Sequence, residues 1–137
     1  MPENPGNIIL SWQIALIING SVKKMEIKFK AQKVTYNEAL DGEIINASFY
    51  QQDSEDFFEK PSKYLSVSIN YEFPPAKPST EWFDGDKFDG GLDIITYSLE
   101  KNSLRIVLQN NMVFDISFDT DENTYKNIYE FLSSACR

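Results

Sequence analysis

Hydrophobic and polar residues alternate with a period of two over most of the chain. The stretch EIKFKAQ at 26–32 has this pattern, which predicts a strand with one buried face. The phase of the alternation changes at Val34 and Tyr36, so we expect a bulge or a bend there. Further strands are predicted at 44–50 and 64–73. The second of these is expected to bury four side chains, Leu65, Val67, Ile69 and Tyr71.

Three segments interrupt the alternation in the first part of the chain. LDGE at 40–43 is predicted to be a turn because of its Asp-Gly pair. The polar stretch at 51–63 is typical of a loop. PPAKPS at 74–79 ends the preceding strand, since proline has no N–H to donate to a sheet.

The second half of the chain has the pattern of three strands joined by tight turns. We predict these strands at 92–100, 103–109 and 112–118. The turns between them are predicted at Lys101-Asn102 and Asn110-Asn111, because asparagine tolerates the positive φ of a two-residue hairpin. The last strand is expected to bury Met112, Phe114, Ile116 and Phe118.

A helix is predicted after these strands. Asp119 and Glu122 form a D-x-x-E capping signal, with acidic side chains at the positive end of the helix. Apolar side chains then recur at helical spacing, at Tyr125, Ile128, Leu132 and Ala135. The predicted fold class is α+β, a mostly antiparallel sheet of five to seven strands with the C-terminal helix packed on one face.

The chain of 137 residues has the length of one domain, and we assign 25–137 to a single α+β domain. Residues 1–24 are considered separately because IILSWQIALII at 8–18 is apolar but shorter than the roughly twenty residues that span a bilayer. No basic region precedes this segment and no small-residue cleavage site follows it. It is an extra strand or helix packed on the domain, a weak secretory signal, or an extension upstream of a natural start near Met25.

Composition and charge exclude several classes of function. The net charge of −8 argues against nucleic acid as a partner and suits a basic protein, which an acidic surface attracts over long range. Histidine, the commonest general base and metal ligand, does not occur in the sequence. The single cysteine, Cys136, forms no internal disulfide, which fits a cytoplasmic location. We therefore expect no catalytic residues, no cofactor and no bound metal, and a protein that is not an enzyme.

The segment EWFDGDKFDGGLD at 81–93 concentrates carboxylates and aromatic rings. As a calcium loop counted from Asp84, it has Phe88 at the fifth position and Asp89 at the sixth, where glycine is required. As a glycosidase site it needs two carboxylates in a sugar-sized cleft, and a chain of this length has little material for one. Two interpretations remain, a solvated hairpin loop with the aromatic rings folded beneath it, or a surface that binds another protein.

Aromatic side chains are enriched among the anchors of protein interfaces, which favours partner binding. The predicted binding residues are three aromatic anchors and three steering charges: Trp82, Phe83 and Phe88, with Asp84, Asp86 and Asp89. Acidic residues also gather at 53–59 and 115–122. If these segments meet the 81–93 loop at one end of the sheet, together they form a negative surface.

Four sequence blocks in one order suggest a family. They are a basic first strand MEIKFKAQKV, the strand KYLSVSINYEF, the hairpin GGLDIITYSLEKNSLRIVL, and a strand ending in FD before the helix TYKNIYEFL. From about residue 26 to residue 133 the chain resembles the immunity protein 10 family of bacterial polymorphic toxin systems. The resemblance implies a protein without catalysis that binds and neutralises a cognate toxin domain in the cell that makes the toxin. It implies no particular contact residues.

A second class of function stays open, a small ligand-binding or accessory domain that uses one sheet face as an apolar pocket. This alternative predicts a closed apolar pocket of a few hundred Å³ with a few convergent polar groups.

Overall fold

The computed structural model describes residues 25–53 and 62–136. The interpretations of the segment 1–24 therefore concern residues outside the described part, as do the acidic residues at 55, 56 and 59.

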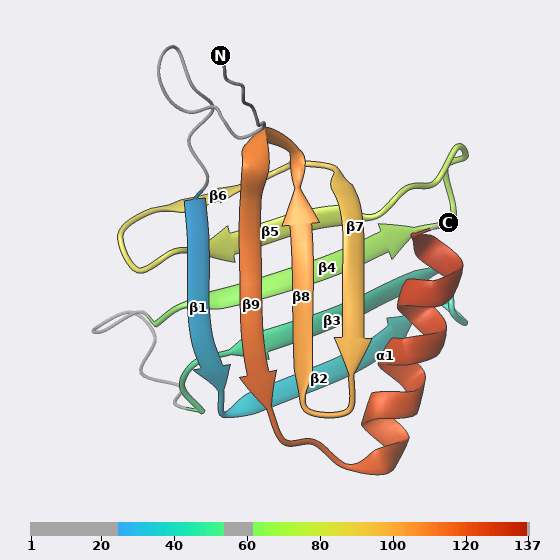
Figure 1. Ribbon diagram of the computed structural model, residues 1–137. Helices are drawn as coiled ribbons and strands as arrows, with labels where there is room; N and C mark the ends of the chain where they lie inside the picture. Colours follow the sequence, from blue (N-terminus) through green and yellow to red (C-terminus); the bar gives the residue numbers. More distant parts are fainter. Residues whose placement is uncertain (1–24, 54–61, 137) are drawn as a thin grey trace, which may run out of the picture.

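Nine described strands form two sheets that pack face to face, with the strands of one sheet crossing those of the other (Figure 1). The four-stranded sheet has the order β1 (Met25–Ala31), β9 (Met112–Phe118), β8 (Ser103–Leu108) and β7 (Ile94–Glu100). The five-stranded sheet has the order β2 (Lys33–Ala39), β3 (Ile44–Tyr50), β4 (Tyr64–Asn70), β5 (Ser79–Phe83) and β6 (Phe88–Gly90). Neighbouring strands are antiparallel except for β1 and β9, which are parallel.

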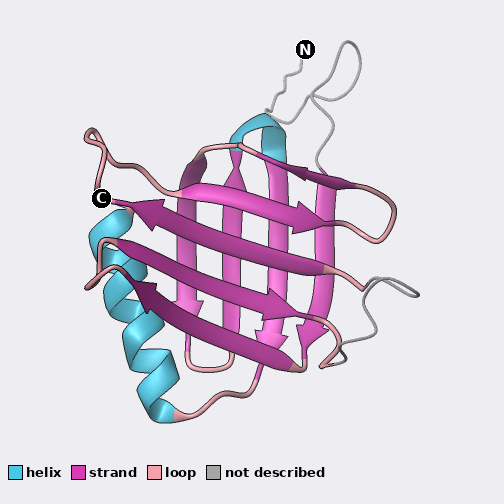
Figure 2. Ribbon diagram, turned by 180° about the vertical axis from the view of Figure 1, so that it is seen from behind, coloured by secondary structure: helices cyan, strands magenta, loops and turns pink. Residues whose placement is uncertain are grey.

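One helix, α1 (Glu122–Ala135), accompanies the strands, so the predicted α+β class is confirmed. The described strands outnumber the five to seven expected, because two short strands, β5 and β6, lie in the part of the chain predicted to be a loop. The helix lies along one side of the sandwich (Figure 2), where Phe131 contacts Tyr36 of β2 with ring centroids 6.4 Å apart.

The expected change of phase near Val34 marks the passage of the chain between the two sheets. β1 ends at Ala31, Gln32 is a bend, and β2 begins one residue later. The N–H of Gln32 donates to the carbonyl oxygen of Tyr50 at 2.9 Å, which already belongs to the five-stranded sheet. The alternation therefore restarts because the chain meets the shared core from the opposite side.

The core lies between the two sheets, and most of the residues predicted to be buried belong to it. The confirmed residues are Ile27, Phe29, Ala31, Leu65, Val67, Ile69, Met112, Phe114, Ile116 and Phe118. Tyr71 is 37% exposed, so its predicted burial is wrong. Because β4 ends at Asn70, Tyr71 lies beyond the sheet that would have placed it over the core.

The predicted asparagine turn is confirmed, and the helix cap is found two residues after its predicted position. Asn110 and Asn111, in the short 3₁₀ turn η2 (Gln109–Asn111), have φ values of 65° and 60°, as expected for this turn. The N-cap of α1 is Asp121, whose Oδ1 accepts the N–H of Thr124 at 2.7 Å. The predicted cap at Asp119 is thus two residues early, since the chain leaving β9 needs a short connection before the helix begins.

Candidate functional site

The predicted binding segment forms a tight hairpin between β5 and β6. The carboxylate Oδ1 of Asp84 accepts the N–H groups of Asp86 and Lys87 at 2.8 and 2.9 Å. The N–H of Asp84 donates to the carbonyl oxygen of Lys87 at 3.2 Å, and Gly85 supplies a φ of 104°. Asp84 therefore shapes the turn with its side chain, a use typical of aspartate in turns.

Two of the three aromatic residues are buried, on opposite faces of the five-stranded sheet. Trp82 is 2% exposed and packs edge-on against Phe114 in the core, with ring centroids 5.7 Å apart. Phe83, the next residue, points to the outer face because side chains alternate along a strand, and it is 5% exposed. The expectation that both project as anchors is therefore corrected. Phe88 is 54% exposed and stays a predicted contact.

Phe83 is covered by other aromatic rings. The strand register aligns Tyr50, Tyr64, Phe83 and Phe88 in one row across the outer face of the sheet. The ring centroids of Phe83 and Phe88 lie 4.4 Å apart, and those of Tyr64 and Phe88 lie 6.3 Å apart. Burial, followed by the charge of Glu81, raises the pKa of Tyr64 above its ordinary value. These contacts use much of the aromatic surface within the protein itself.

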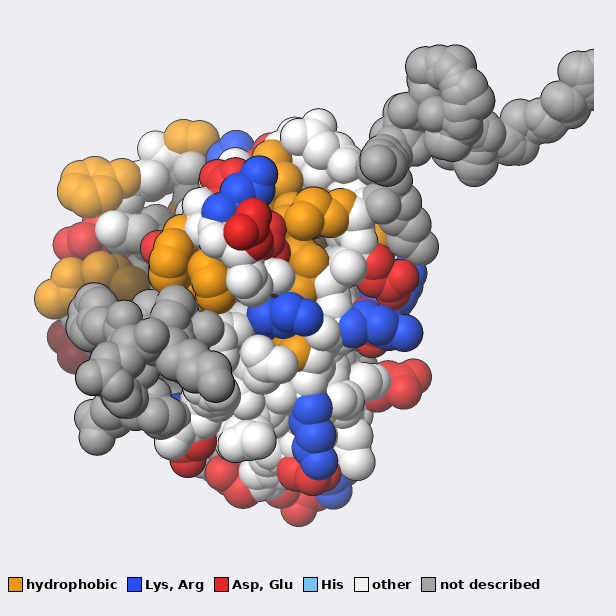
Figure 3. Space-filling view, turned by 90° about the vertical axis from the view of Figure 1, so that its left-hand side faces the viewer, with side chains coloured by type: hydrophobic (Ala, Val, Ile, Leu, Met, Phe, Trp, Pro, Cys, Tyr) orange, Lys and Arg blue, Asp and Glu red, His pale blue; other side chains and the backbone are white. Residues whose placement is uncertain are grey.

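The charges of the hairpin are mixed. Burial opposes ionisation of Asp84, but the N–H groups of Lys87 and Asp86 outweigh it and lower the pKa of this carboxyl. Asp86 and Asp89 remain exposed. Lys87 follows directly, and a Cβ at the turn residue Gly85 would lie 3.2 Å from the side chain of Lys63. Figure 3 views the molecule from this side and shows acidic and basic side chains close together.

The acidic segment at 115–122 does not join the hairpin. It runs from β9 into the start of α1, at a different corner of the sandwich (Figure 1). Its first carboxylate, Asp115, pairs with Arg105 at 3.3 Å. A continuous negative surface built from these two segments is therefore not formed.

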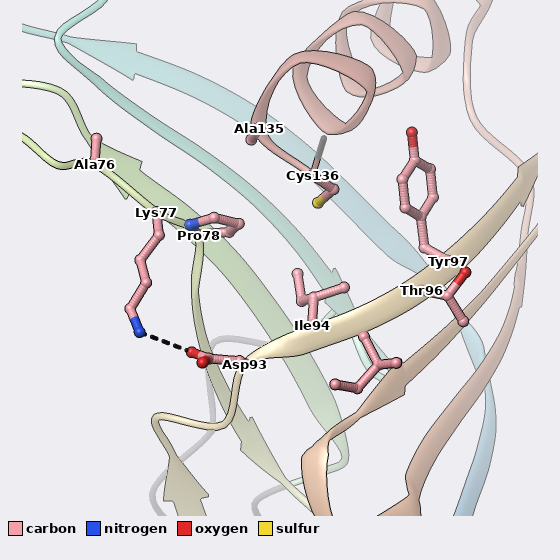
Figure 4. A pocket seen from close by; sticks show the side chains of 10 residues that line it. Ala76, Lys77, Pro78, Asp93, Ile94, Thr96, Tyr97, Ala135 and Cys136 are labelled. Carbon is pink, nitrogen blue, oxygen red and sulfur yellow. Dashed lines mark hydrogen bonds and ion pairs between the residues drawn. The ribbon is translucent and has the colours of Figure 1, made fainter.

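A cavity of about 460 Å³ lies between β7, the segment 76–78 and the end of α1 (Figure 4). Ile94, Pro78 and Ala135 contribute apolar side chains, and an ion pair of 3.1 Å joins Lys77 and Asp93 beside them. Its size fits the alternative function, but it lies at the side of the sandwich and opens to solvent.

Cys136 lines the same cavity. Burial raises the pKa of its thiol, so the uncharged form dominates at neutral pH. Since the nucleophile is the thiolate, this environment does not activate Cys136. Across residues 25–53 and 62–136, no three potential metal-ligating acidic or thiol side chains come together. Within the same residues, no helix has the length and apolar character needed to cross a membrane.

Among the described residues, the exposed large apolar side chains that lie outside strands and the helix are at the opposite end of the five-stranded sheet, whereas Ile95, which is 64% exposed, lies within β7. Phe73 is 75% exposed and Leu40 is 58% exposed. Phe73 belongs to the loop after β4, and Leu40 belongs to the turn between β2 and β3. The sequence contained a signal for both, since each is a large apolar residue outside a strand and next to turn-forming Asp-Gly or Pro-Pro. We call residues 38–43 and 71–75 the paired-loop surface.

The described residues thus define a small two-sheet α+β domain with apolar side chains exposed on loops. No family model, curated protein or solved structure matches the chain.

Proposed function

We propose that this protein is an immunity protein, which binds and neutralises a cognate bacterial toxin domain in the cytoplasm of the cell that makes the toxin. The observation that supports this proposal best is the exposure of Phe73 and Leu40 on neighbouring loops. Large apolar side chains exposed together are typical of surfaces that bind other proteins. The protein acts by occupying a surface of the toxin and needs no reaction of its own.

The charge of the chain supports the same proposal. A net charge of −8 suits a basic partner, whose approach an acidic protein accelerates. The order of sequence blocks that resembles the immunity protein 10 family points to this class of partner.

A tagged pull-down from the source cell, washed at moderate salt and analysed by mass spectrometry, tests the proposal. We expect one stoichiometric partner, the C-terminal fragment of a large secreted protein. Co-expression of this fragment with the immunity protein should restore growth that the fragment alone prevents. Recovery of nothing above background while the toxin is expressed, or failure to protect, would reject the proposal.

The cavity beside Cys136 supports a second candidate, the binding of a small ligand that has both polar and apolar groups. Its volume of about 460 Å³ is within the range of small-molecule sites. A ligand held there should raise the melting temperature of the wild type and have no effect on the variant Ile94→Trp, in which the new side chain fills the cavity. An equal shift in both proteins would exclude the cavity as the binding site.

A further inference from the structure

We infer that the paired-loop surface is the docking surface, and that it binds a basic patch on the partner protein with Phe73 and Leu40 as anchors. The inference rests on the proposed function and assigns the interface to the end of the sheet opposite the 84–87 turn (Figure 1).

One backbone hydrogen bond joins the two loops, and further hydrogen bonds order each loop internally. The N–H of Tyr71 donates to the carbonyl oxygen of Glu43 at 2.7 Å, which joins the loop after β4 to the β2–β3 turn. Within that turn, the N–H of Glu43 donates to the carbonyl oxygen of Leu40 at 3.1 Å. The N–H of Glu72 donates to Oδ1 of Asn70 at 2.9 Å. The anchors thus extend from an ordered backbone, which lowers the entropy lost on binding.

Leu40 has a conformation that the fold alone does not favour for leucine. Its φ is 52°, in the left-handed region that glycine and asparagine occupy more readily. Its side chain is also 58% exposed, so burial in the core does not compensate for the strain. A strained backbone that presents an apolar side chain to solvent is a feature associated with functional surfaces.

Carboxylates surround these apolar side chains. The paired-loop surface contains four of them, Glu38, Asp41, Glu43 and Glu72, and no lysine or arginine. All four residues are exposed, and none belongs to an ion pair among the described residues. The nearest basic residue along the chain, Lys77, lines a shallow hollow together with Phe73, and its charge is paired with Asp93 at 3.1 Å.

A mainly acidic surface around apolar anchors matches a basic protein surface with apolar recesses. The hairpin lacks this combination, because Lys87 and Lys63 lie among its acids. Charge complementarity therefore favours the paired-loop surface as the contact with a basic partner.

The test measures the affinity of full-length variants for the toxin domain recovered in the pull-down, inactivated by mutation. Phe73→Ala and Leu40→Ala should each weaken binding about 30-fold, as expected for interface anchors. The comparison variant is Phe88→Ala, which removes a ring of the same size from the hairpin, the surface that the sequence predicts as the contact. If the paired-loop surface is the interface instead, this variant should change affinity less than about twofold. Circular dichroism of each variant confirms that the fold is retained.

Charge supplies a second, independent measurement on the same complex. The double variant Glu43→Gln/Glu72→Gln should slow association several-fold at low salt and much less at high salt, with dissociation nearly unchanged. Equal loss for Phe88→Ala and Phe73→Ala, or loss for Phe88→Ala alone, would overturn the inference and leave the proposed function in place. Absence of binding by the wild type would instead reject the proposed function.

Discussion

The two ends of the five-stranded sheet contain similar residues in different surroundings. At the hairpin end, the rings of Phe83 and Phe88 pack with centroids 4.4 Å apart, and lysines lie among the acids. At the paired-loop end, Phe73 is 75% exposed, residues 38–43 and 71–75 contain carboxylates but no basic residue, and the nearby Lys77 is paired with Asp93. The hairpin end uses its aromatic residues to complete the fold, whereas the paired-loop end leaves them available.

The difference follows from where each residue stands relative to a strand. Trp82 lies inside β5, so alternation places its ring between the sheets. Phe73 lies beyond the end of β4 and before two prolines, where no sheet position draws it inward. A dense group of acids and rings in a sequence therefore predicts exposed anchors only for those residues that do not face a covered side of a sheet.

The largest expected effect is the loss of stability on truncating a ring, which should be large at the hairpin end and small at the paired-loop end. Trp82→Ala should destabilise the protein by about 3–5 kcal/mol, because it leaves a cavity beside Phe114 in the core. Phe73→Ala should change stability by less than about 0.5 kcal/mol, as expected for an exposed side chain. Urea denaturation followed by circular dichroism measures both. A similar cost for the two variants would contradict the division between a buried and an exposed end.

Local pattern predicted most strands because each strand has one face on the core. The alternation in 26–32 and 112–118 places alternate apolar residues inward, and the structure confirms both strands. The division into two sheets was not predictable in this way. It depends on the parallel pairing of Met25 with Met112 and its neighbours, which joins segments far apart in the sequence.

The candidate site was also only partly predictable from the sequence. The sequence identifies the acids and rings of 81–93, but it does not reveal that β5 and β6 are short strands covered by Tyr64. The exposure of Leu40 depends on the positive φ of the turn and that of Phe73 on the end of β4. The first is a local property of the β2–β3 hairpin, whereas the second depends on how far β4 pairs with its neighbours.

Two adjacent glycines of the hairpin end are expected to differ in how much stability a substitution by alanine costs. A Cβ at Gly90 would lie 2.6 Å from the carbonyl oxygen of Thr80, whereas a Cβ at Gly91 would meet nothing within 4 Å. Gly90→Ala should therefore cost about 1–3 kcal/mol by forcing β5 and β6 apart. Gly91→Ala should cost about 1 kcal/mol, from its φ of 85° alone. Thermal unfolding of the two variants measures the difference, and equal melting temperatures would contradict the close approach.

The stability that Asp84 contributes to the hairpin end should depend on pH. Its pKa is lowered in the folded protein, so its contribution to stability is complete above its ordinary pKa of 3.8 and is lost as the pH falls through the lowered value. Asp84→Ala should cost about 1 kcal/mol at neutral pH, because two N–H groups of the turn lose their acceptor. The cost should shrink in urea titrations below pH 4.

Asp84→Asn is the control for this experiment, since its side-chain oxygen still accepts both N–H groups but has no charge to titrate. Its stability relative to the wild type should therefore rise as the pH falls below 4. A difference between the two proteins that stays constant from pH 7 to pH 3 would show that the charge of Asp84 contributes nothing to the turn.

The smallest expected change in stability is at Leu40, and it tests whether the strained backbone of the paired-loop surface lowers stability while it favours binding. Leu40→Gly relieves the strain of a φ of 52° and should stabilise the protein by about 0.5 kcal/mol, after the added freedom of the unfolded chain is counted. Leu40→Ala keeps the strain and should not stabilise it. Both variants lose the apolar anchor, so both should bind the toxin domain more weakly. If only the glycine variant combines greater stability with weaker binding, the strained turn serves to present the Leu40 side chain to the partner. If the glycine variant is destabilised, leucine adopts this turn without strain.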